Sequence, residues 1–236
     1  MSPLAQRILF MDGEAIILDK PSGLPVDPPR DGSLSLENHL ASLTFGFQRW
    51  PLAVHRLDRD TSGCLLLARN PKAHKRFTAA FEAGDVAKTY LAAVAGAPET
   101  DEGEINLPLA KISSPEKGWR MIGSEKKGKA ALTRWRLIKT IEGPEGPISL
   151  IACFPTTGRT HQIRVHLADG LGLGIIGDPV YGAPAIDAKA PMLLHALSLS
   201  IPRGAKPPAE ATAPLPDRFI DAGFTQKMLD DAGICP

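Results

Sequence analysis

The chain has 236 residues, which is enough for one large domain or two small ones, and 43% of them are hydrophobic, so a sizeable core is expected. The three cysteines lie far apart without a Cys-x-x-Cys pair, which argues against a zinc ribbon and a disulfide framework and fits a reducing cytoplasm. No run approaches the ~18 apolar residues of a membrane span, and the N-terminus lacks the pattern of a signal peptide. We therefore expect a cytoplasmic protein with no membrane partner.

The formal net charge is only +1, which for the whole chain does not indicate a nucleic-acid partner. The charge is unevenly distributed, because residues 111–139 hold nine basic residues against two acidic ones, whereas acidic residues lead by six to four in residues 1–54. The nine basic residues are Lys111, Lys117, Arg120, Lys126, Lys127, Lys129, Arg134, Arg136 and Lys139. A local basic face of this kind can bind phosphates, and an exposed lysine-rich loop is the alternative.

The first elements are predicted from their turn and capping residues. Two apolar runs flank Asp12-Gly13, a tight-turn pair, so residues 7–20 are predicted to form a hairpin. Two prolines and a glycine make residues 19–26 a stiff, turned segment. A helix is expected after the capping residue Ser35, with three leucines on one face, namely Leu36, Leu40 and Leu43.

The sequence HRLDRDTSG at residues 55–63 lies between two apolar runs, 51–54 and 64–68. Two strand-like arms that feed a polar connector are a common way to hold reactive groups on a rigid frame. A charged surface hairpin whose Asp and Arg side chains pair is the simpler interpretation. The apolar Leu57 inside the cluster and the Thr-Ser-Gly that follows it favour the first interpretation.

The middle of the chain is predicted to contain one helix followed by several strands. Asn70 and Pro71 predict the start of a helix and Gly84 predicts its end. Residues 86–96 form a β-like run, and the acidic residues 101–104 are predicted to form a turn. Four further strands are predicted, at residues 105–109, 120–122, 130–138 and 148–154.

A second polar cluster, PTTGRTHQIRVHL, occupies residues 155–167. A turn leads there into a short helix on which His161 and Arg164, three residues apart, can share a face. The rest of the chain is predicted to form a turn at 178–182, a buried strand at 192–199, a proline-rich surface loop at 202–216 and an amphipathic helix from 217 onward.

Several kinds of catalytic site are excluded by the spacing of these residues. The Glu of a His-Glu-x-x-His site is absent, so no metal site is expected despite six histidines. A kinase would need a Gly-rich loop and Asp-Phe-Gly, and a serine hydrolase would need Gly-x-Ser-x-Gly, and the chain has none of these.

A carboxylate with basic partners remains as the candidate chemistry. Asp58 can act as a nucleophile or general base if a nearby Arg56 or Arg59, or a distant arginine, keeps it ionised. A glycosidase would need a second poised carboxylate, and the spacing leaves open whether Asp60 could serve.

The stretch at residues 55–63 resembles the His-Arg-Leu-Asp-x-x-Thr-Ser-Gly signature of the RluA family of pseudouridine synthases. Further segments resemble other motifs of that family in the same order, at residues 19–24, 88–90, 158–166, 177–182 and 194–196. The resemblance implies an α+β protein with a mixed, mostly antiparallel sheet in two halves that flank a cleft. It also implies a single catalytic domain over residues 1–236.

Members of this family cut the glycosidic bond of a uridine in RNA, rotate the base and rejoin it through carbon, without a cofactor or metal. The resemblance implies that Asp58 is the catalytic aspartate, that Tyr90 stacks on the target base and relays a proton, and that Arg164 pairs with Asp58 and keeps it ionised. Arg56 is implied to help evert the uridine. Whether Asp58 attacks the ribose, attacks the base or takes a ribose proton stays open.

The same motifs imply substrate-binding residues besides Arg56. They are His55, Arg59, Thr61, Arg159 and His161, with Ile163 and Leu194 on the floor of an apolar pocket. Lys20 and Pro21 are expected to brace the loop of Asp58, and local hydrogen bonds of residues 61–63 are expected to fix its turn.

The chain also departs from the family pattern. We expect no RNA-binding domain of the S4 type, so the basic hairpins of residues 111–139 are expected to bind the RNA. Residues 25–28 read Pro-Val-Asp-Pro where the family often has Val-Val-His-Pro. We expect a monomeric, bacterial-type isomerase that acts on uridines in a tRNA or rRNA stem-loop. The alternative is an RNA-binding protein of the same fold that lacks activity or acts as an RNA-folding chaperone.

Overall fold

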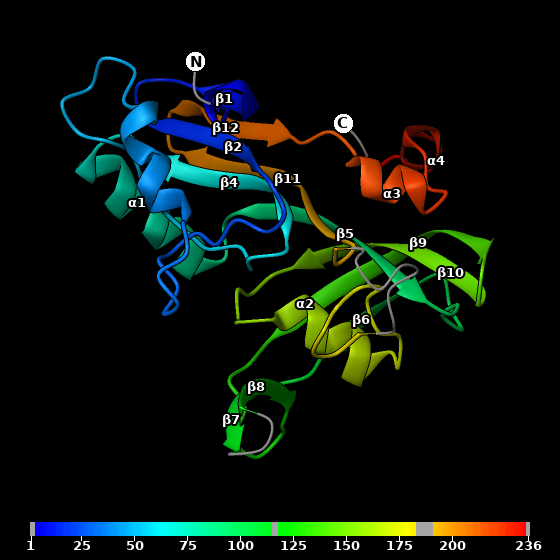
Figure 1. Cartoon of the computed structure of the whole chain (residues 1–236). Coiled ribbons are helices and arrows are strands. Elements are labelled where there is room, and N and C mark those ends of the chain that lie inside the picture. Colours follow the sequence, from blue (N-terminus) through cyan, green and yellow to red (C-terminus); the bar gives the residue numbers. More distant parts are fainter. Residues whose placement is uncertain (1–2, 115–117, 183–190, 235–236) are drawn as a thin grey trace. The chain divides into compact units, whose positions relative to one another are not determined.

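The computed structural model describes residues 3–114, 118–182 and 191–234, and the chain forms two compact units. Unit 1 comprises residues 1–88 and 195–214, and unit 2 comprises residues 89–194 and 215–236. The predicted α+β class with a mostly antiparallel sheet is confirmed, and the strands are divided between the two units (Figure 1). Lys117, one of the nine basic residues named above, lies outside the described residues.

The sheet of unit 1 has the strand order β1-β2-β4-β11, with β12 paired to β11 and β3 paired to β4. These pairs are antiparallel except for β4 and β11, which run parallel. The strands are β1 (Ile8–Met11), β2 (Ala15–Lys20), β3 (Leu52–Ala53), β4 (Ser62–Ala68), β11 (Leu194–Arg203) and β12 (Lys206–Thr212). The predicted hairpin of residues 7–20 is therefore confirmed, and a short 3-10 helix, η1 (Ala5–Arg7), precedes it.

Helix α1 (Pro71–Ala83) begins and ends where the sequence predicts. The side chain of Asn70 accepts a hydrogen bond from the backbone N–H of Ala73 (2.9 Å), which satisfies one of the first N–H groups of the helix. Gly84 ends the helix with a φ of 80°, a left-handed conformation that glycine adopts without strain. Phe77 is fully buried in the core that α1 shares with β2, β4, β11 and β12.

The helix predicted after Ser35 is a 3-10 helix, η2 (Leu36–Leu43), and its three leucines are buried as predicted. The backbone N–H of Ser35 donates to the side-chain oxygen of Asn38 (2.9 Å), which closes the first turn.

The prediction of a surface loop at residues 202–216 is wrong for most of that segment. Residues 206–212 form β12, an edge strand in register with β11 from Ser198 opposite Thr212 to Arg203 opposite Lys206. Prolines are tolerated on an edge strand because no further strand needs their missing N–H groups. The sequence predicts a loop here because prolines are rare in central strands.

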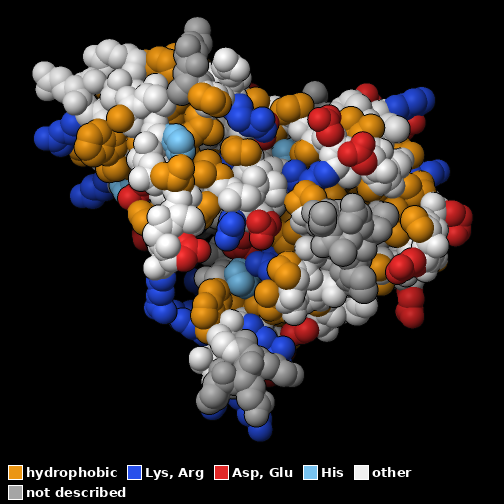
Figure 2. Space-filling model, viewed as in Figure 1, with side chains coloured by type: hydrophobic (Ala, Val, Ile, Leu, Met, Phe, Trp, Pro, Cys, Tyr) orange, Lys and Arg blue, Asp and Glu red, His pale blue; other side chains and the backbone are white. Residues whose placement is uncertain are grey.

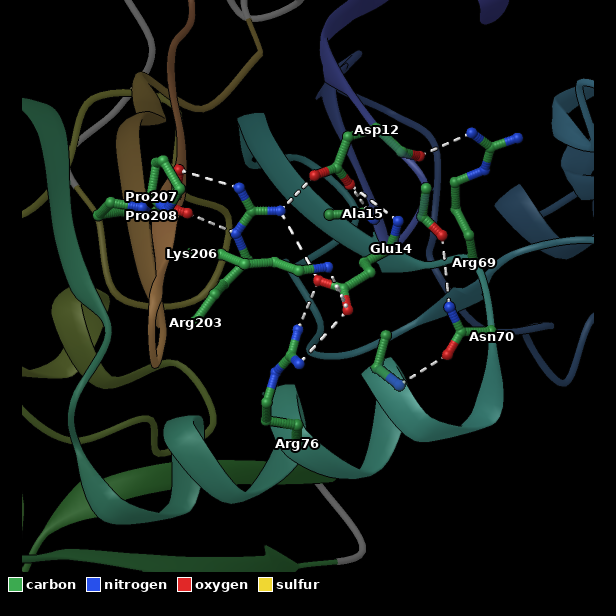
Figure 3. A network of polar contacts seen from close by, with 12 residues as sticks. Asp12, Glu14, Ala15, Arg69, Asn70, Arg76, Arg203, Lys206, Pro207 and Pro208 are labelled. Atoms are coloured by element: carbon green, nitrogen blue, oxygen red, sulfur yellow. Dashed lines mark hydrogen bonds and ion pairs between the residues drawn. The ribbon is translucent and has the colours of Figure 1, made fainter.

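A charged network joins β12 to the rest of unit 1 (Figure 3). Arg203, with only 6% of its side chain exposed, pairs with Asp12 in the turn between β1 and β2, and its Nε donates to the carbonyl of Pro207 (2.7 Å). Glu14 pairs with Arg76 of α1 (2.8 Å) and with Lys206 of β12 (3.1 Å). Four elements are thereby cross-linked at one edge of the sheet.

The sheet of unit 2 is antiparallel, with the strand order β5-β10-β9-β6, and β7 and β8 form a separate hairpin. The strands are β5 (Ala87–Ala95), β6 (Glu102–Asn106), β7 (Leu109–Ser114), β8 (Gly118–Gly123), β9 (Leu132–Gly143) and β10 (Gly146–Pro155). The helices are α2 (Gln162–Val165), which continues as a π-helical turn η3 (His166–Gly170), then α3 (Asp217–Asp221) and α4 (Gln226–Asp231).

Two predictions for unit 2 need correction. Residues 102–104 do not form a turn but begin β6, where Glu102 lies opposite Arg136 and Glu104 opposite Arg134 of β9. Opposite charges across neighbouring strands favour this pairing, which a composition-based prediction of an acidic turn does not consider.

The predicted C-terminal helix is split into α3 and α4. Gly223 separates them with a φ of 96°, and Phe224 next to it is fully buried. The apolar residues of this amphipathic pattern therefore belong to two short helices separated by Gly223, not to one long helix. None of the helices in the described part of the chain is long and apolar enough to cross a membrane.

Candidate active site

Asp58 lies in unit 1, in the connection from β3 to β4. Its carbonyl accepts a hydrogen bond from the backbone N–H of Thr61 (3.2 Å), so residues 58–61 form a turn that presents the half-buried Asp58. Leu57, which precedes it, is only 7% exposed and anchors the turn in the core. The sequence prediction of a polar connector with an apolar anchor is therefore confirmed.

Lys20 lies beneath this turn, at the end of β2, and its side chain is fully buried. Its ammonium donates to the carbonyls of Pro21 (2.9 Å), Leu24 (2.8 Å) and Arg59 (3.0 Å). Three N–H donors thus meet three acceptors, which is what a lysine ammonium can satisfy without water. The bond to Arg59 ties the segment of residues 20–24 directly to the loop of Asp58, as the sequence predicts.

Two further hydrogen bonds join the same two segments. The Ser22 hydroxyl donates to the carbonyl of Asp60 (2.8 Å), and the backbone N–H of Gly23 donates to the carbonyl of Arg59 (2.9 Å). Gly23 has a φ of 84°, a conformation that a residue with a Cβ rarely adopts. The loop of Asp58 is therefore held on a rigid support before any substrate binds.

The Thr-Ser-Gly that follows has a different role from the predicted local turn. Ser62 and Gly63 already belong to β4, and the Ser62 hydroxyl bonds to Nδ1 of His195 on β11 (2.6 Å). A Cβ on Gly63 would lie 2.1 Å from the carbonyl oxygen of Ala196, so only glycine allows β4 to approach β11 here. These residues fix a contact between strands far apart in the sequence, while the buried Thr61 closes the turn.

His55 and Arg56 flank the Asp58 turn on its other side. The Nε2 of His55 accepts the backbone N–H of Leu66 (3.0 Å), and its ring stacks on Phe81 (4.5 Å between centroids). Burial, aided by the charge of Lys88, lowers the pKa of His55 to about 3, so the ring is neutral and supports the loop. Its predicted contact with substrate stays a prediction.

Arg56 is exposed and pairs with Asp27 (2.8 Å). Asp27 occupies one of the two positions in residues 25–28 at which the sequence departs from the family pattern. Arg59 is also exposed, and its Nε donates to the carbonyl of Gly23 (3.3 Å). Both arginines are accessible to an RNA phosphate.

The other predicted catalytic residues, Tyr90 and Arg164, belong to unit 2. Tyr90 is on β5 opposite Cys153 of β10, and it is half-buried against the apolar cluster of unit 2. Ile163 and Leu194, the predicted pocket residues, are members of that cluster, with exposures of 6% and 3%. The structure therefore brings Tyr90 and both predicted apolar residues together.

Arg164 of α2 is buried and forms a two-pronged ion pair with Asp178. Its Nε donates to Oδ2 (2.6 Å) and its Nη2 to Oδ1 (2.8 Å) of that carboxylate. Asp178 also accepts the backbone N–H of Val180 (2.9 Å). Burial by itself opposes ionisation of Asp178, but the bonds from Arg164 and from the backbone outweigh it and lower the pKa below its usual value.

Asp178 is a site residue that the sequence analysis did not name. The motif at residues 177–182 marked its position, but the spacing could not show that this turn folds back onto α2. Tyr181 of the same motif lies with its ring 5.0 Å from the Arg164 guanidinium, and its hydroxyl is 2.9 Å from Nδ1 of His161. His161 precedes α2 in a left-handed conformation, so it does not share a helix face with Arg164 as predicted; Tyr181 links the two residues instead.

The loop before α2 is organised by Gln162, which the sequence analysis also did not name. Its buried side-chain oxygen accepts from the Thr157 hydroxyl (2.7 Å) and from the backbone N–H of Arg159 (3.0 Å). Arg159 itself is exposed and donates from Nε to the carbonyl of Ala130 (3.1 Å). His161 has a φ of 54°, which is unusual for a residue other than glycine and is a form of strain that often marks functional sites.

The β7–β8 hairpin and the turn after it carry the predicted basic surface of unit 2. Exposed basic side chains in this region are Lys111, Lys126, Lys127 and Lys129. Figure 2 shows Lys and Arg side chains around this hairpin, at the lower end of the view. Within the described residues, no three His, Cys, Asp or Glu side chains are grouped so that they could hold a metal ion.

Comparison with known proteins gives a consistent result. Residues 14–169 match the family described as RNA pseudouridylate synthase. An uncharacterized RNA pseudouridine synthase of Zymomonas mobilis is 58% identical over 224 residues, which cover 95% of this chain and 100% of that protein. The dual-specificity RNA pseudouridine synthase RluA of Escherichia coli is 36% identical over 198 residues, 82% of this chain and 85% of that one.

A solved structure has the same fold. Human RNA pseudouridylate synthase domain containing 1 superposes with a TM-score of 0.77 and 26% sequence identity, covering 100% of this chain and 98% of that one.

Proposed function

This chain belongs to the RNA pseudouridylate synthase family and is therefore an isomerase that acts on uridine in RNA. We propose that Asp58 is its catalytic carboxylate and that its substrate is a structured tRNA or rRNA. The observation that carries this proposal is the support of the Asp58 turn by the buried ammonium of Lys20. A surface hairpin made only of paired charges would not need a buried lysine beneath it. Such support is expected where a side chain must be held for chemistry.

The reaction sets the requirements that the residues must meet. The bond between N1 of uracil and C1′ of ribose breaks, a bond between C5 and C1′ forms, C5 loses a proton and N1 gains one. Product and substrate contain the same atoms, so the overall step consumes no co-reactant. An ionised carboxylate can assist by attacking the ribose, by attacking the base or by taking a ribose proton, and Asp58 can supply it in each case.

We assign to Tyr90 the stacking on the target base and a share in the proton transfer at C5. Arg164 supplies positive charge that keeps the catalytic carboxylate ionised. The two hydrogen bonds to Asp178 fix the plane of the Arg164 guanidinium in advance, so that little reorganisation is needed when RNA binds. Tyr90 and Arg164 come from unit 2, and Asp58 comes from unit 1.

The remaining residues of the motifs are assigned to substrate binding. Arg56 helps to evert the uridine, because a guanidinium plane can stack on bases and bind phosphate. The others are His55, Arg59, Thr61, Arg159, His161, Ile163 and Leu194. The exposed lysines near β7 and β8 bind the RNA backbone, and the protein acts as a monomer in the cytoplasm.

Release of the C5 hydrogen tests this proposal. The purified chain is incubated with tRNA and, separately, with rRNA labelled with tritium at C5 of uridine, and tritium released to water is counted. We expect release from one of the two RNA fractions at a small number of sites, which pseudouridine mapping then locates. Absence of release from both fractions would contradict the proposed activity and substrate.

A further inference from the structure

Trp119 of β8 is a large aromatic residue that the fold leaves half exposed, at 50% of its accessible surface. It lies opposite Ser113 and two residues before Met121, so Trp119 and Met121 share one face of the hairpin. Met121 is buried in a cluster with Leu109 and Val165, and this cluster already packs the hairpin against the rest of unit 2. The exposed indole is therefore not needed to close the core.

The indole of Trp119 is nevertheless held in place. Its ring stacks on the ring of His161, with centroids 5.2 Å apart and planes inclined by 28°. The His161 Nδ1 is 2.9 Å from the Tyr181 hydroxyl oxygen, which also accepts the backbone N–H of Met121 (2.9 Å). Because that oxygen accepts from Met121, its own hydrogen can be donated to His161. The indole thus stacks on His161, whose ring is oriented by the Tyr181 hydroxyl, and that hydroxyl is in turn bonded to β8 at Met121.

One lysine lies against this aromatic pair, and three more follow the strand in the sequence. The Lys111 ammonium lies 5.1 Å from the centre of the Trp119 ring, and Lys111 is itself exposed. Lys126, Lys127 and Lys129 follow β8 directly, and all three are exposed. A rigid aromatic surface next to lysines is the combination that proteins use for unpaired nucleic acid, because bases stack on the ring while phosphates pair with the cations.

We propose that Trp119, supported by His161, is a stacking platform for an unpaired base of the RNA other than the uridine that is isomerised. Lys111 then turns from the indole to a phosphate of the stacked nucleotide. This inference rests on the proposed RNA substrate, and it adds a residue that selects single-stranded RNA over duplex RNA. Duplex RNA keeps its bases paired and stacked, so it can reach the lysines but not the platform.

A comparison of matched variants tests the platform. Binding of fluorescein-labelled ten-nucleotide oligouridine, oligoadenosine and a ten-base-pair RNA duplex is measured for the wild type, Trp119→Ala, Trp119→Phe and Trp50→Ala. Trp50, which is 57% exposed in unit 1, is the control for the loss of an exposed indole. Thermal unfolding of each variant checks that it is folded.

We expect Trp119→Ala to weaken binding of the single strands by roughly 5- to 150-fold, the contribution of one base–aromatic stack. Trp119→Phe should retain most of the affinity, and duplex binding and Trp50→Ala should change by less than about twofold. RNA-induced quenching of tryptophan fluorescence should disappear in Trp119→Ala and persist in Trp50→Ala.

Unchanged affinity of a folded Trp119→Ala variant for both single strands would overturn the proposal. Equal weakening for duplex and single strands would also overturn it, because Trp119 would then act only through the shape of the hairpin. Neither measurement depends on turnover. Failure of the platform therefore leaves tritium release by the wild type intact, whereas failure of the proposed activity abolishes that release and leaves these affinities as they are.

Discussion

At the scale of single residues, two buried charges organise the parts of the candidate site. Lys20 is fully buried and is satisfied by three carbonyls, and Arg164 is buried and is satisfied by Asp178. A buried charge is tolerated only when it is paired or well hydrogen-bonded. Each of these residues therefore holds a segment that carries a proposed catalytic residue, Asp58 in unit 1 and Arg164 itself in unit 2.

The pair of Arg164 and Asp178 gives the first prediction. Asp178→Asn keeps the size of the side chain but removes the carboxylate that accepts two hydrogen bonds from the buried Arg164 guanidinium, so the free energy of unfolding should fall by about 3–5 kcal/mol. The rate of tritium release should fall as well, because the guanidinium plane is no longer fixed. Urea unfolding and single-turnover kinetics measure the two effects.

The matched control is Asp231→Asn, which removes the exposed partner of Lys227 (2.8 Å) and should cost under about 1 kcal/mol. If Asp178→Asn is no more costly than this control, Arg164 does not depend on Asp178.

The sequence indicated Arg164 but not Asp178, and the reason is physical. A motif shows which residues occur together in a family, whereas an ion pair depends on how a turn folds back onto a helix. The same limit applies to Gln162, whose hydrogen bonds reach Thr133 across 29 residues (3.0 Å). The prediction succeeded for Leu57, because burying an apolar side chain within a charged loop is favourable and anchors that loop.

At the scale of elements, Gly63 shows how one residue sets the spacing of two strands. A side chain at its φ of 103° would be strained, and a Cβ at this position would lie only 2.1 Å from the Ala196 carbonyl oxygen, so the two strands would have to move apart. Gly63→Ala should therefore destabilise unit 1 by more than the roughly 1–3 kcal/mol of backbone strain alone. Urea unfolding measures this loss.

Gly13→Ala is the control for Gly63→Ala. A Cβ at Gly13 would meet nothing within 4 Å, so this change should leave the stability nearly unaltered. Equal stability of the two variants would show that β4 and β11 do not approach as closely as described.

The charged network that joins the turn between β1 and β2 to β11, β12 and α1 predicts a dependence of stability on pH. Burial opposes ionisation of Asp12, but bonds from the backbone and from Arg203 lower its pKa below the usual 3.8. The hydrogen bond from Arg76 lowers the pKa of Glu14 below 4.5. Groups with lowered pKa in the folded state stabilise the protein above their unfolded pKa, and this contribution is lost as the pH falls through the folded pKa.

The double variant Asp12→Asn/Glu14→Gln should therefore be less stable than the wild type at pH 7, with a difference that shrinks as the pH falls below about 4. Urea unfolding at pH 7, 5, 4 and 3 measures the difference. A difference that stays constant over this range would mean that the two carboxylates act by packing and not by charge.

Hairpins and helix ends were predicted well because their signals are local, as with Asp12-Gly13 and with Asn70 before Pro71. Elements that depend on distant partners were predicted poorly. The prolines of β12 predict a loop because the sequence does not show the pairing of this strand with β11. The acidic residues at 102–104 predict a turn because their partners on β9 are about 30 positions away. The parallel pair of β4 and β11 joins residues 133 apart and has no local signal.

At the scale of the whole molecule, a net charge of +1 conceals the basic surface near β7 and β8. Lys126→Glu/Lys127→Glu should weaken RNA binding and reduce the slope of log affinity against log salt concentration by about 1–2, since fewer counterions are released. The control with the same change in net charge is Lys72→Glu/Lys75→Glu, at two exposed lysines of α1. Equal slopes for the two double variants would place the RNA-binding surface elsewhere.

The central claim is that the carboxylate of Asp58 performs the chemistry. The most direct test is the rate of tritium release from C5-labelled RNA by Asp58→Asn, with Asp60→Asn as the control two residues away. We predict that Asp58→Asn lowers release to the background level while its RNA affinity stays within about twofold of the wild type, because the change removes a charge and little volume. Asp60→Asn should retain turnover. Release by Asp58→Asn within tenfold of the wild-type rate would contradict the assignment of Asp58.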